Sequence, residues 1–381
     1  MKLFWHKMKI KIIFINLFVF FLIFLTADLI FSNFVYKRNI SHKCYEHDED
    51  GKFYKLQKNC YAQMKLLETL DSFKLYTDKN GNRFSGSVTR STNKNIYFIG
   101  DSIAFGLGVN WENSFAGIVE SQKKNYNVTN LGVPGYSPSV YNYILQNLVK
   151  TKDIKGDKVF VVIDLSDVHN EVGRWRISKN KQKPYLISTI NKKLSGFKKF
   201  KRENLKGLYL ISTYIRETGR SLRKLKKKEL NMRYNEDWPA SGTMQGGFTY
   251  TNFNDLDNCE NEKKENKAWI CGGVNLGLSK IEEKIINLGK LVKLNNAKFY
   301  IVIIPWPETL NFGQNNFNWE NYINNICKLS GCEKVINVFP EFKKIKNTRE
   351  DWLKYLYLKR DTHLTNMGNK IVAEKILKNS F

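Results

Sequence analysis

Side chains that commonly bind metals are scarce in this sequence: its 381 residues include only five histidines and six cysteines. The cysteines lack the spacing of a zinc site and have no histidine partners close by, so we exclude a zinc site. We find no internal repeat, which argues against a repeat architecture. With so few histidines, the sequence also offers few candidates for a general base.

Acidic residues are scarce relative to basic ones. The chain has 36 Asp and Glu against 62 Lys and Arg, which gives a formal net charge of +26. No nucleic-acid recognition motif accompanies this charge, so we expect no nucleic-acid partner. An anionic membrane surface or an acidic polymer fits better, because a dense positive field attracts either without specific contacts. Compositional bias toward lysine is the simpler alternative.

A long apolar run, residues 12–31, follows a flank with four lysines: Lys2, Lys7, Lys9 and Lys11. The run reaches the roughly 20 residues that a membrane-spanning helix needs. Lysines flanking such a helix stay in the cytoplasm, which places the rest of the chain outside. A secretory signal cleaved after Leu25-Thr26-Ala27 is the alternative. The large Leu25 and the apolar residues beyond Ala27 favour a retained single-pass anchor.

The six cysteines fall into three local pairs: Cys44 with Cys60, Cys259 with Cys271, and Cys327 with Cys332. An even number of cysteines that lie close together in sequence as pairs is typical of disulfides formed in an oxidising compartment. The sequence does not fix their connectivity. Together with the anchor, the pairs predict a periplasmic or otherwise extracytoplasmic domain.

The rest of the chain, 42% hydrophobic overall and 14% aromatic, has material for one large core. Residues 32–93 are polar and mixed, with a turn at 76–83, and we interpret them as a stalk and lead-in region. From 94 to 381, apolar strand-like runs alternate with helical patterns. The runs are 96–99, 128–131, 159–163 and 299–304, and the helices lie near 112–123, 138–150, 281–288 and 371–377. This alternation predicts an α/β fold with helices on both faces of a parallel sheet.

Residues 170–270 interrupt the alternation and carry basic clusters at 174–176, 198–202 and 220–228. We interpret this segment as an insertion over the carboxyl edge of the sheet, where open α/β folds place their sites. It is either a solvated surface or a lid that binds a polymer. In the second interpretation, Trp175 and Trp238 are candidate platforms for stacking sugars.

Three short segments carry candidate chemistry. Ser102, in Gly100-Asp101-Ser102, directly follows the strand at 96–99, and a serine at a strand-to-helix turn is exposed beside backbone N–H groups. A plain turn with a helix cap is the alternative. Gly132 follows the next strand, where a glycine lets a backbone N–H approach a reacting carbonyl.

The third segment, Asp361-Thr362-His363, precedes the last helix. Its spacing lets the carboxylate hold one imidazole nitrogen while the other nitrogen faces Ser102. The remaining histidines lie on the cytoplasmic flank, in the lead-in region or near the insertion: His6, His42, His47 and His169. His363 is therefore the natural general base, with a surface histidine as the alternative.

These segments together resemble the SGNH/GDSL hydrolase superfamily over residues 94–380, with the insertion unmatched. Residues 100–109 resemble its nucleophile block, residues 130–135 its glycine block, and residues 304–307 a strand-end segment of some members. The Asp-x-His spacing resembles the alginate O-acetyltransferase-like branch. The resemblance implies a three-layer, flavodoxin-like parallel sheet.

It also implies a serine esterase or acyltransferase with Ser102, Asp361 and His363 as catalytic residues and no metal or cofactor. The oxyanion donors would be the N–H groups of Ser102 and Gly132. Ser166 stands where the family usually has an asparagine, and Asn170 is another candidate donor. The expected substrate is an acyl ester, namely the O-acyl groups of envelope or exported glycans. The alternatives are O-acetyl transfer to such glycans, lipid-ester hydrolysis, and a non-catalytic glycan-binding protein. The sequence does not indicate an oligomeric state.

Overall fold

The computed structural model describes most of the chain outside the 170–270 region: residues 2–36, 44–48, 53–66, 71–86, 92–178, 183–186, 246–250 and 273–381, with a few positions between 204 and 215. The chain divides into two compact units. One unit comprises Met1–His42 and Asn191–Tyr234, and the other comprises Lys43–Ile190 and Asn235–Phe381. The candidate site residues all lie in the second unit.

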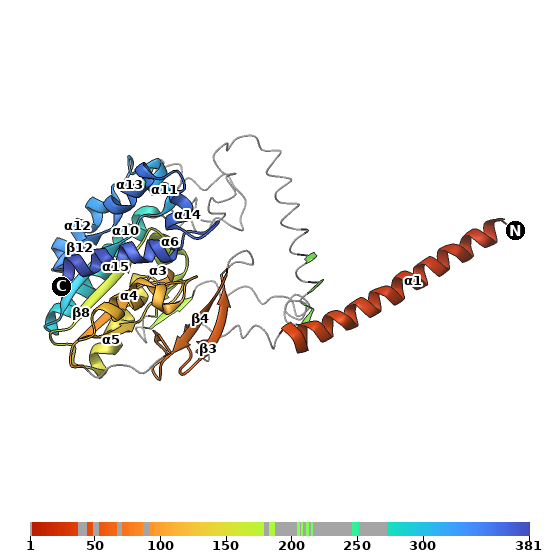
Figure 1. The fold of residues 1–381 in the computed structure, drawn as a ribbon, viewed down its shortest axis with the longest axis horizontal. Helices are drawn as coiled ribbons and strands as arrows, with labels where there is room; N and C mark the ends of the chain where they lie inside the picture. The colour runs from red at the N-terminus through yellow and green to blue at the C-terminus, as the bar shows by residue number, and fades with distance from the viewer. Residues whose placement is uncertain are drawn as a thin grey trace. The chain divides into compact units, whose positions relative to one another are not determined.

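Five parallel strands form the centre of the second unit (Figure 1): β6 (Asn95–Ile99), β7 (Asn127–Asn130), β8 (Lys158–Ile163), β11 (Lys298–Ile303) and β12 (Lys334–Asn337). Their spatial order is β7-β6-β8-β11-β12, in which the first strand of the series lies between the second and the third. This is the strand order of flavodoxin-like folds. The expected α/β class with a mostly parallel sheet is confirmed.

Helices cover both faces of this sheet. Successive strand residues point to opposite sides, and both sides are apolar, so each face is buried against helices. Ile99 and Val161 belong to the core on one face, and Phe98 and Val162 to the core on the other. The first face packs against α5 (Pro138–Thr151), α10 (Val274–Leu294) and α12 (Trp319–Ser330). The second packs against α4 (Phe115–Gln122), α13 (Phe339–Thr348) and α15 (Asn366–Ser380). The strands and helices expected from the sequence are all present within a few residues.

The lead-in region contributes strands to the same sheet. β3 (Tyr61–Lys65), β4 (Ser72–Thr77) and β5 (Arg83–Phe84) pair antiparallel, and Arg83 of β5 pairs with Asn130 of β7. The sheet therefore has eight strands in the order β12-β11-β8-β6-β7-β5-β4-β3. The domain boundaries at residues 31, 93 and 170–270 stay predictions.

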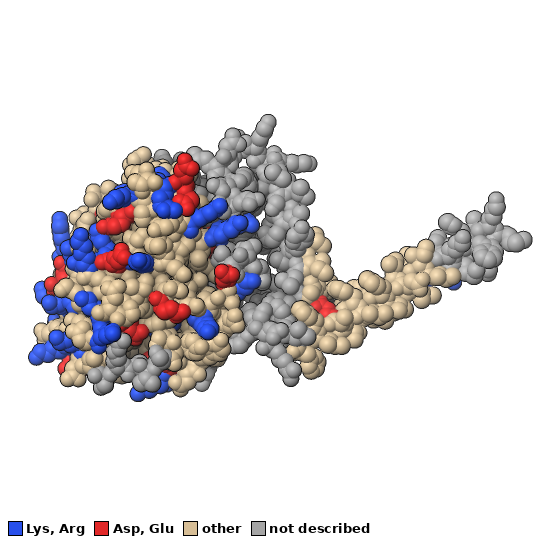
Figure 2. Space-filling view, viewed as in Figure 1, with Lys and Arg blue, Asp and Glu red and all other residues tan. Residues whose placement is uncertain are grey.

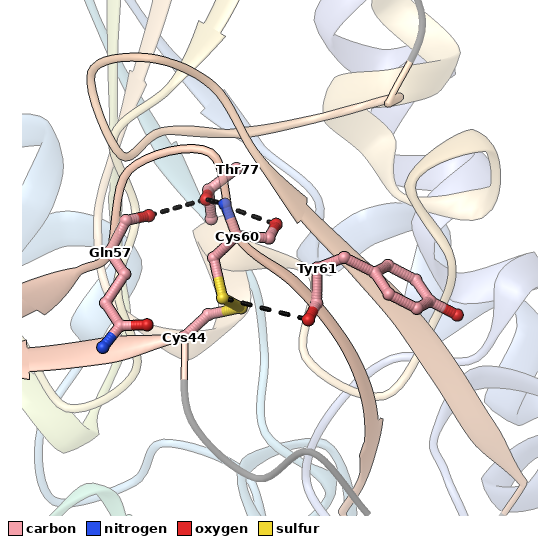
Figure 3. The surroundings of a disulfide bond; sticks show 5 residues. All are labelled: Cys44, Gln57, Cys60, Tyr61 and Thr77. Atoms are coloured by element: carbon pink, nitrogen blue, oxygen red, sulfur yellow. Dashed lines mark hydrogen bonds between the residues drawn. A yellow bond between two sulfur atoms is a disulfide. The ribbon is translucent and has the colours of Figure 1, made fainter.

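A hairpin of β1 (Tyr45–His47) and β2 (Tyr54–Leu56) precedes these strands. The Cys44–Cys60 disulfide closes its base (Figure 3), and the Thr77 hydroxyl donates to the Gln57 carbonyl at 2.6 Å. A second disulfide joins Cys327 and Cys332. These are two of the three expected pairs, and Cys259 and Cys271 lie outside the described residues.

Short elements complete the second unit: α3 (Ser102–Phe105), η2 (Trp111–Asn113), α6 (Ser166–Gly173), β9 (Trp175–Ile177), β10 (Pro184–Leu186), η4 (Gly247–Thr249), α11 (Pro307–Phe312) and α14 (Trp352–Leu356). β9 and β10 form a hairpin where the basic insertion was expected to begin. Trp175 is only 1% exposed, and its indole N–H donates to the Gly135 carbonyl at 2.8 Å. The expectation that Trp175 stacks sugars is therefore wrong, because its ring is buried. Trp238 lies outside the described residues.

The first unit contains α1 (Lys2–Ile30), which continues into a π-helical turn, η1 (Phe31–Tyr36). Residues Lys11–Phe34 are long and apolar enough to cross a membrane, and little of their surface is buried. Figure 2 shows few charged side chains on the described part of this helix, whereas both signs of charge are scattered over the visible face of the second unit. The helix fits either a signal anchor or a signal peptide.

Candidate active site

The carboxyl ends of three parallel strands bring Ser102, Gly132 and Ser166 to one edge of the sheet. Ser102 follows β6, Gly132 follows β7, and Ser166 follows β8. β6 lies between β7 and β8. The chain therefore leaves β6 where the strand order reverses, which is where open α/β sheets form a crevice. The sheet order thus collects residues that are far apart in sequence.

Ser102 is the first residue of the short helix α3, which begins directly after β6. The carboxylate of Asp101 caps this helix by accepting a hydrogen bond from the Ile103 N–H at 2.9 Å. The Ser102 hydroxyl is partly exposed and donates to Asp101 Oδ2 at 3.4 Å. The capping and the nucleophile interpretations of this segment are therefore compatible, because Asp101 supplies the cap and leaves Ser102 at the open end.

Asp361 and His363 lie in a tight loop between α14 and α15. One carboxylate oxygen of Asp361 accepts a hydrogen bond from the His363 backbone N–H at 2.9 Å and also contacts Nδ1 of the imidazole ring. Both side chains are largely buried, with 13% and 14% exposed. The two-residue spacing thus places the carboxylate on one ring nitrogen, and the ring is held in a fixed orientation.

Carboxylates at the ends of β6 and β8 also affect the pKa of His363. Burial lowers the pKa of the imidazole, but the hydrogen bond and charge of Asp361, with the charges of Asp101 and Asp164, outweigh burial and raise the pKa above 6.5. For Asp361, burial has the opposite effect and raises the pKa. The hydrogen bonds and the charge of His363 outweigh burial, so the pKa of Asp361 lies below its usual range. The charges of Asp101, the residue next to Ser102, and of Asp164 therefore favour the protonated form of His363.

A cluster of buried carboxyl groups surrounds Ser166. Its hydroxyl lies 2.6 Å from Asp164 Oδ1 and 3.2 Å from Asp101 Oδ2. Asp167 completes the cluster by accepting hydrogen bonds from the Asp164 N–H at 3.1 Å and from the Tyr141 hydroxyl at 2.8 Å. All three aspartates are at most 4% exposed. These residues form a continuous polar network beneath α3.

Burial controls the ionisation of this network. Burial and the charge of Asp164 raise the pKa of Asp101 to about 7. Burial also raises the pKa of Asp164, and it holds the pKa of Asp167 well above the usual range. Burial therefore favours the protonated form of each of these carboxyl groups.

Gly132 packs flat against α3. A β-carbon at this position would come within 2.7 Å of the Phe105 nitrogen and 2.8 Å of the Ala104 β-carbon, so only glycine fits. The Gly132 N–H donates to Asn130 Oδ1 at 2.9 Å, and the Asn130 amide donates to the Ala104 carbonyl at 2.7 Å. The glycine therefore lies beside α3, and its N–H is bonded to the Asn130 side chain.

The two weaker oxyanion candidates lie in α6. Ser166 begins the helix, and its hydroxyl faces carboxylates, which is a poor orientation for donating to a substrate oxyanion. Asn170 lies one turn further along and is 4% exposed. Neither position offers the freely projecting amide that the family resemblance implies.

Arg83 of β5, which no sequence pattern identified, forms hydrogen bonds at the end of α3. Its guanidinium donates to the carbonyl oxygens of Phe105, Gly106 and Val109 at 2.5, 2.7 and 2.5 Å. It also stacks 4.7 Å from the Phe105 ring centre and is only 1% exposed. Burial lowers the pKa of Arg83 to about 9, which keeps it charged at neutral pH. No local pattern identifies this residue, because its contacts are with a segment more than twenty positions away.

Among the residues that the structure describes, no group of three or more His, Cys, Asp or Glu side chains is arranged to hold a metal ion. No protein-family model matches the chain, and no curated protein matches it by sequence.

Several solved structures are similar to this one at low identity. A member of the lipolytic protein G-D-S-L family from Veillonella parvula is 11% identical, with a TM-score of 0.41 over 75% of this chain and 98% of its own. Axe2, an acetylxylan esterase from Geobacillus stearothermophilus, is 11% identical, with a TM-score of 0.39 over 76% and 94%. LAE5, an alpha/beta hydrolase enzyme from the metagenome of Lake Arreo, is 10% identical, with a TM-score of 0.39 over 76% and 95%. Because these scores are below 0.5, the fold and site descriptions rest on the strand order and contacts above.

Proposed function

We propose that the chain is a serine ester hydrolase of the SGNH/GDSL kind, with Ser102 as nucleophile, His363 as general base and Asp361 as the residue that orients the base. The observation that carries the proposal is the loop in which Asp361 accepts a hydrogen bond from the His363 N–H and contacts Nδ1 of the imidazole. The charge of Asp101, the neighbour of Ser102, also contributes to the raised pKa of His363. A carboxylate that holds one ring nitrogen fixes the tautomer whose other nitrogen accepts a proton.

In the proposed reaction, the Ser102 oxygen attacks the ester carbonyl carbon as His363 takes the hydroxyl proton. The tetrahedral intermediate then collapses, the alcohol leaves with the proton from His363, and the acyl group remains on Ser102. An incoming water, activated by His363, attacks this acyl-enzyme and releases the acid. A sugar hydroxyl in place of water would make the same cycle an acyl transfer.

The developing oxyanion would be stabilised by the backbone N–H groups of Ser102 and Gly132. The Gly132 N–H would exchange Asn130 for the oxyanion, since an N–H has only one proton to donate. Removing one such donor from an ester-cleaving site typically lowers the rate about 100-fold to 1000-fold. Asn170 is the remaining candidate for a side-chain donor, because the Ser166 hydroxyl faces two carboxylates.

For the substrate we propose an O-acyl group on an envelope or exported glycan, with the catalytic unit tethered outside the cytoplasmic membrane. Support comes from the apolar helix at Lys11–Phe34 and the two disulfides. Asp28, near the end of this helix, accepts hydrogen bonds from the N–H groups of Gly207 and Leu208 at 2.7 and 2.8 Å. This contact favours a retained helix, because it bonds the helix to residues of the 170–270 segment.

Substrate class is tested by assaying the detergent-solubilised chain on an acetylated glycan and on a lysophospholipid. We expect release of acetate from the glycan and little cleavage of the lipid, with both activities lost in Ser102→Ala. Robust activity on the lipid alone would refute the glycan substrate but keep the serine mechanism. Acetate appearing on an added glycan acceptor, with no net release, would identify the enzyme as a transferase.

A further inference from the structure

A cleft with a volume of about 650 Å³ lies within the second unit, apart from the proposed catalytic residues. Its walls are the β1–β2 hairpin, the turn after β4, the loop after β7 and the exposed side of α5. Ser102, Asp361 and His363 do not line it. The proposed ester chemistry therefore leaves this cleft unexplained.

The charged side chains lining the cleft balance one another. Lys55 is 2.9 Å from Glu46, and Lys183 is 2.8 Å from Asp48. Among the described residues that line the cleft, two lysines and two carboxylates give a formal charge of zero in a chain with a net charge of +26. A site for a phosphate or an acidic polymer would gather unpaired cations. The cleft is therefore suited to a neutral ligand.

Amide and aromatic side chains provide the rest of its recognition chemistry. The Phe53 and Tyr143 rings meet edge to face, with centroids 5.6 Å apart, and Tyr143 is partly exposed. Asn80 and Asn147 are exposed amides that line the opening. An amide both donates and accepts hydrogen bonds, as a hydroxyl does, and an aromatic ring packs against C–H groups. This combination matches the alternating hydroxyl and C–H surfaces of a sugar.

The cleft is also held in a fixed shape. The Cys44–Cys60 disulfide closes the base of the β1–β2 hairpin (Figure 3). The Tyr54 hydroxyl donates to the Pro134 carbonyl at 2.7 Å, and the Tyr136 hydroxyl donates to the Tyr54 carbonyl at 2.6 Å. The hairpin is therefore bonded to the loop that follows Gly132. A preformed site loses less conformational entropy when a ligand binds.

From these observations we propose that the cleft binds a segment of a neutral oligosaccharide, as an accessory site separate from Ser102. Leu131 and Val133, which line the cleft, flank Gly132 in sequence. A glycan held there lies against the loop that carries the proposed oxyanion donor. The binding itself does not depend on Ser102 being a nucleophile.

The test measures binding to the full-length chain in detergent, carrying Ser102→Ala so that no ester is cleaved. Isothermal titration uses neutral hexamers of xylose, glucose and N-acetylglucosamine, with a hexamer of galacturonic acid as the acidic comparison. We expect saturable binding of at least one neutral hexamer, and weaker binding of the acidic one. No binding of any neutral hexamer, or a preference for the acidic one, would overturn the proposal.

Two variants locate the bound sugar. Asn147→Lys places a longer, charged side chain at an exposed position of the cleft, and Tyr143→Ala removes the aromatic ring. We expect each to weaken binding at least tenfold. Gln146→Lys is the matched control, because Gln146 is exposed on the same helix and does not line the cleft. Affinity that is unchanged in Asn147→Lys, or lost only in His363→Ala, would contradict an accessory site.

Discussion

The Ser166 hydroxyl lies between two buried carboxyl groups, 2.6 Å from Asp164 and 3.2 Å from Asp101. A hydroxyl has a single proton, so both contacts are hydrogen bonds only when one of the two carboxyl groups carries a proton of its own. Burial raises the pKa of both aspartates, which favours a proton on one of the two carboxyl groups. We infer that Ser166 joins the ends of β6 and β8.

Replacing Ser166 with alanine should mainly destabilise the fold. The substitution leaves two buried carboxyl groups without their bridging hydroxyl, which typically costs about 1–3 kcal/mol. Urea denaturation measures this loss, and ester turnover should fall by less than the 100-fold typical of a lost oxyanion donor. Ser121→Ala, at an exposed hydroxyl bonded only to the Ile118 carbonyl, is the control. A 100-fold lower kcat with unchanged stability would instead make Ser166 an oxyanion donor.

The pH dependence of activity should report the environment of His363. Its pKa is raised above 6.5, so the neutral base is lost as pH falls through that raised value. We expect kcat/KM to decline with an apparent pKa above 6.5. Asp164→Asn removes one of the negative charges that favour the imidazolium and should move the decline to lower pH.

The control for this pH shift is Asp351→Asn, since Asp351 is exposed and hydrogen-bonded to Arg349. It should leave the pH profile in place. A decline that stays fixed, or moves upward, in Asp164→Asn would show that Asp164 does not act on the general base. A profile with no decline down to pH 5 would argue against His363 as the base altogether.

Arg83→Met should both destabilise the protein and lower its activity. The variant removes the Arg83 donor from the carbonyl groups of Phe105, Gly106 and Val109, and Gly106 keeps only the Val109 N–H at 3.4 Å. Leaving a buried carbonyl group unpaired costs about 1–3 kcal/mol. These carbonyls fix the end of α3, so Ser102 should lose its position. We expect a lower urea midpoint and reduced kcat, with partial recovery of both in Arg83→Lys.

Arg349→Met provides the comparison for Arg83, because Arg349 is exposed, hydrogen-bonded to Asp351 and 4.1 Å from the Tyr355 ring centre. Its urea midpoint should match that of the wild type. If Arg83→Met retained full stability, the three carbonyl contacts would contribute nothing measurable, and Arg83 would not hold α3.

Protein isolated without reducing agent should contain no free thiol at Cys44, Cys60, Cys327 or Cys332. The first and last pairs are bonded in the structure, as expected for an oxidising compartment. Peptide mapping by mass spectrometry under non-reducing and reducing conditions detects the two linkages. Six free thiols in freshly isolated protein would contradict the extracytoplasmic location.

Local features of the sequence were enough to predict the core of the fold. The apolar runs that became β6, β8 and β11 are short and flanked by helical patterns, and such runs identify buried parallel strands. β12 was not predicted, because only one of its four residues, Ile336, is fully buried and the short segment resembles a loop. The addition of β3, β4 and β5 to the sheet depends on pairing with β7, which no local pattern encodes.

In the candidate site, contacts between residues close in sequence were predictable, and contacts between separate strands were not. The contact between Asp361 and His363 follows from a two-residue spacing. The contact of Ser166 with Asp101 depends on β6 and β8 being neighbours in the sheet, which no local pattern shows. The family resemblance suggested instead that Ser166 is an oxyanion donor. Trp175 was misjudged for a related reason, since the partner that buries its indole, Gly135, lies forty positions away.

The central claim is that His363 activates the Ser102 hydroxyl. The most direct measurement is labelling of the detergent-solubilised chain with a fluorophosphonate, followed by mass spectrometry of the modified peptide. We predict a single adduct on Ser102, lost in Ser102→Ala, strongly slowed in His363→Ala and retained in the control Ser121→Ala. A folded wild-type protein that takes up no label, or takes it up at another residue, would contradict the account.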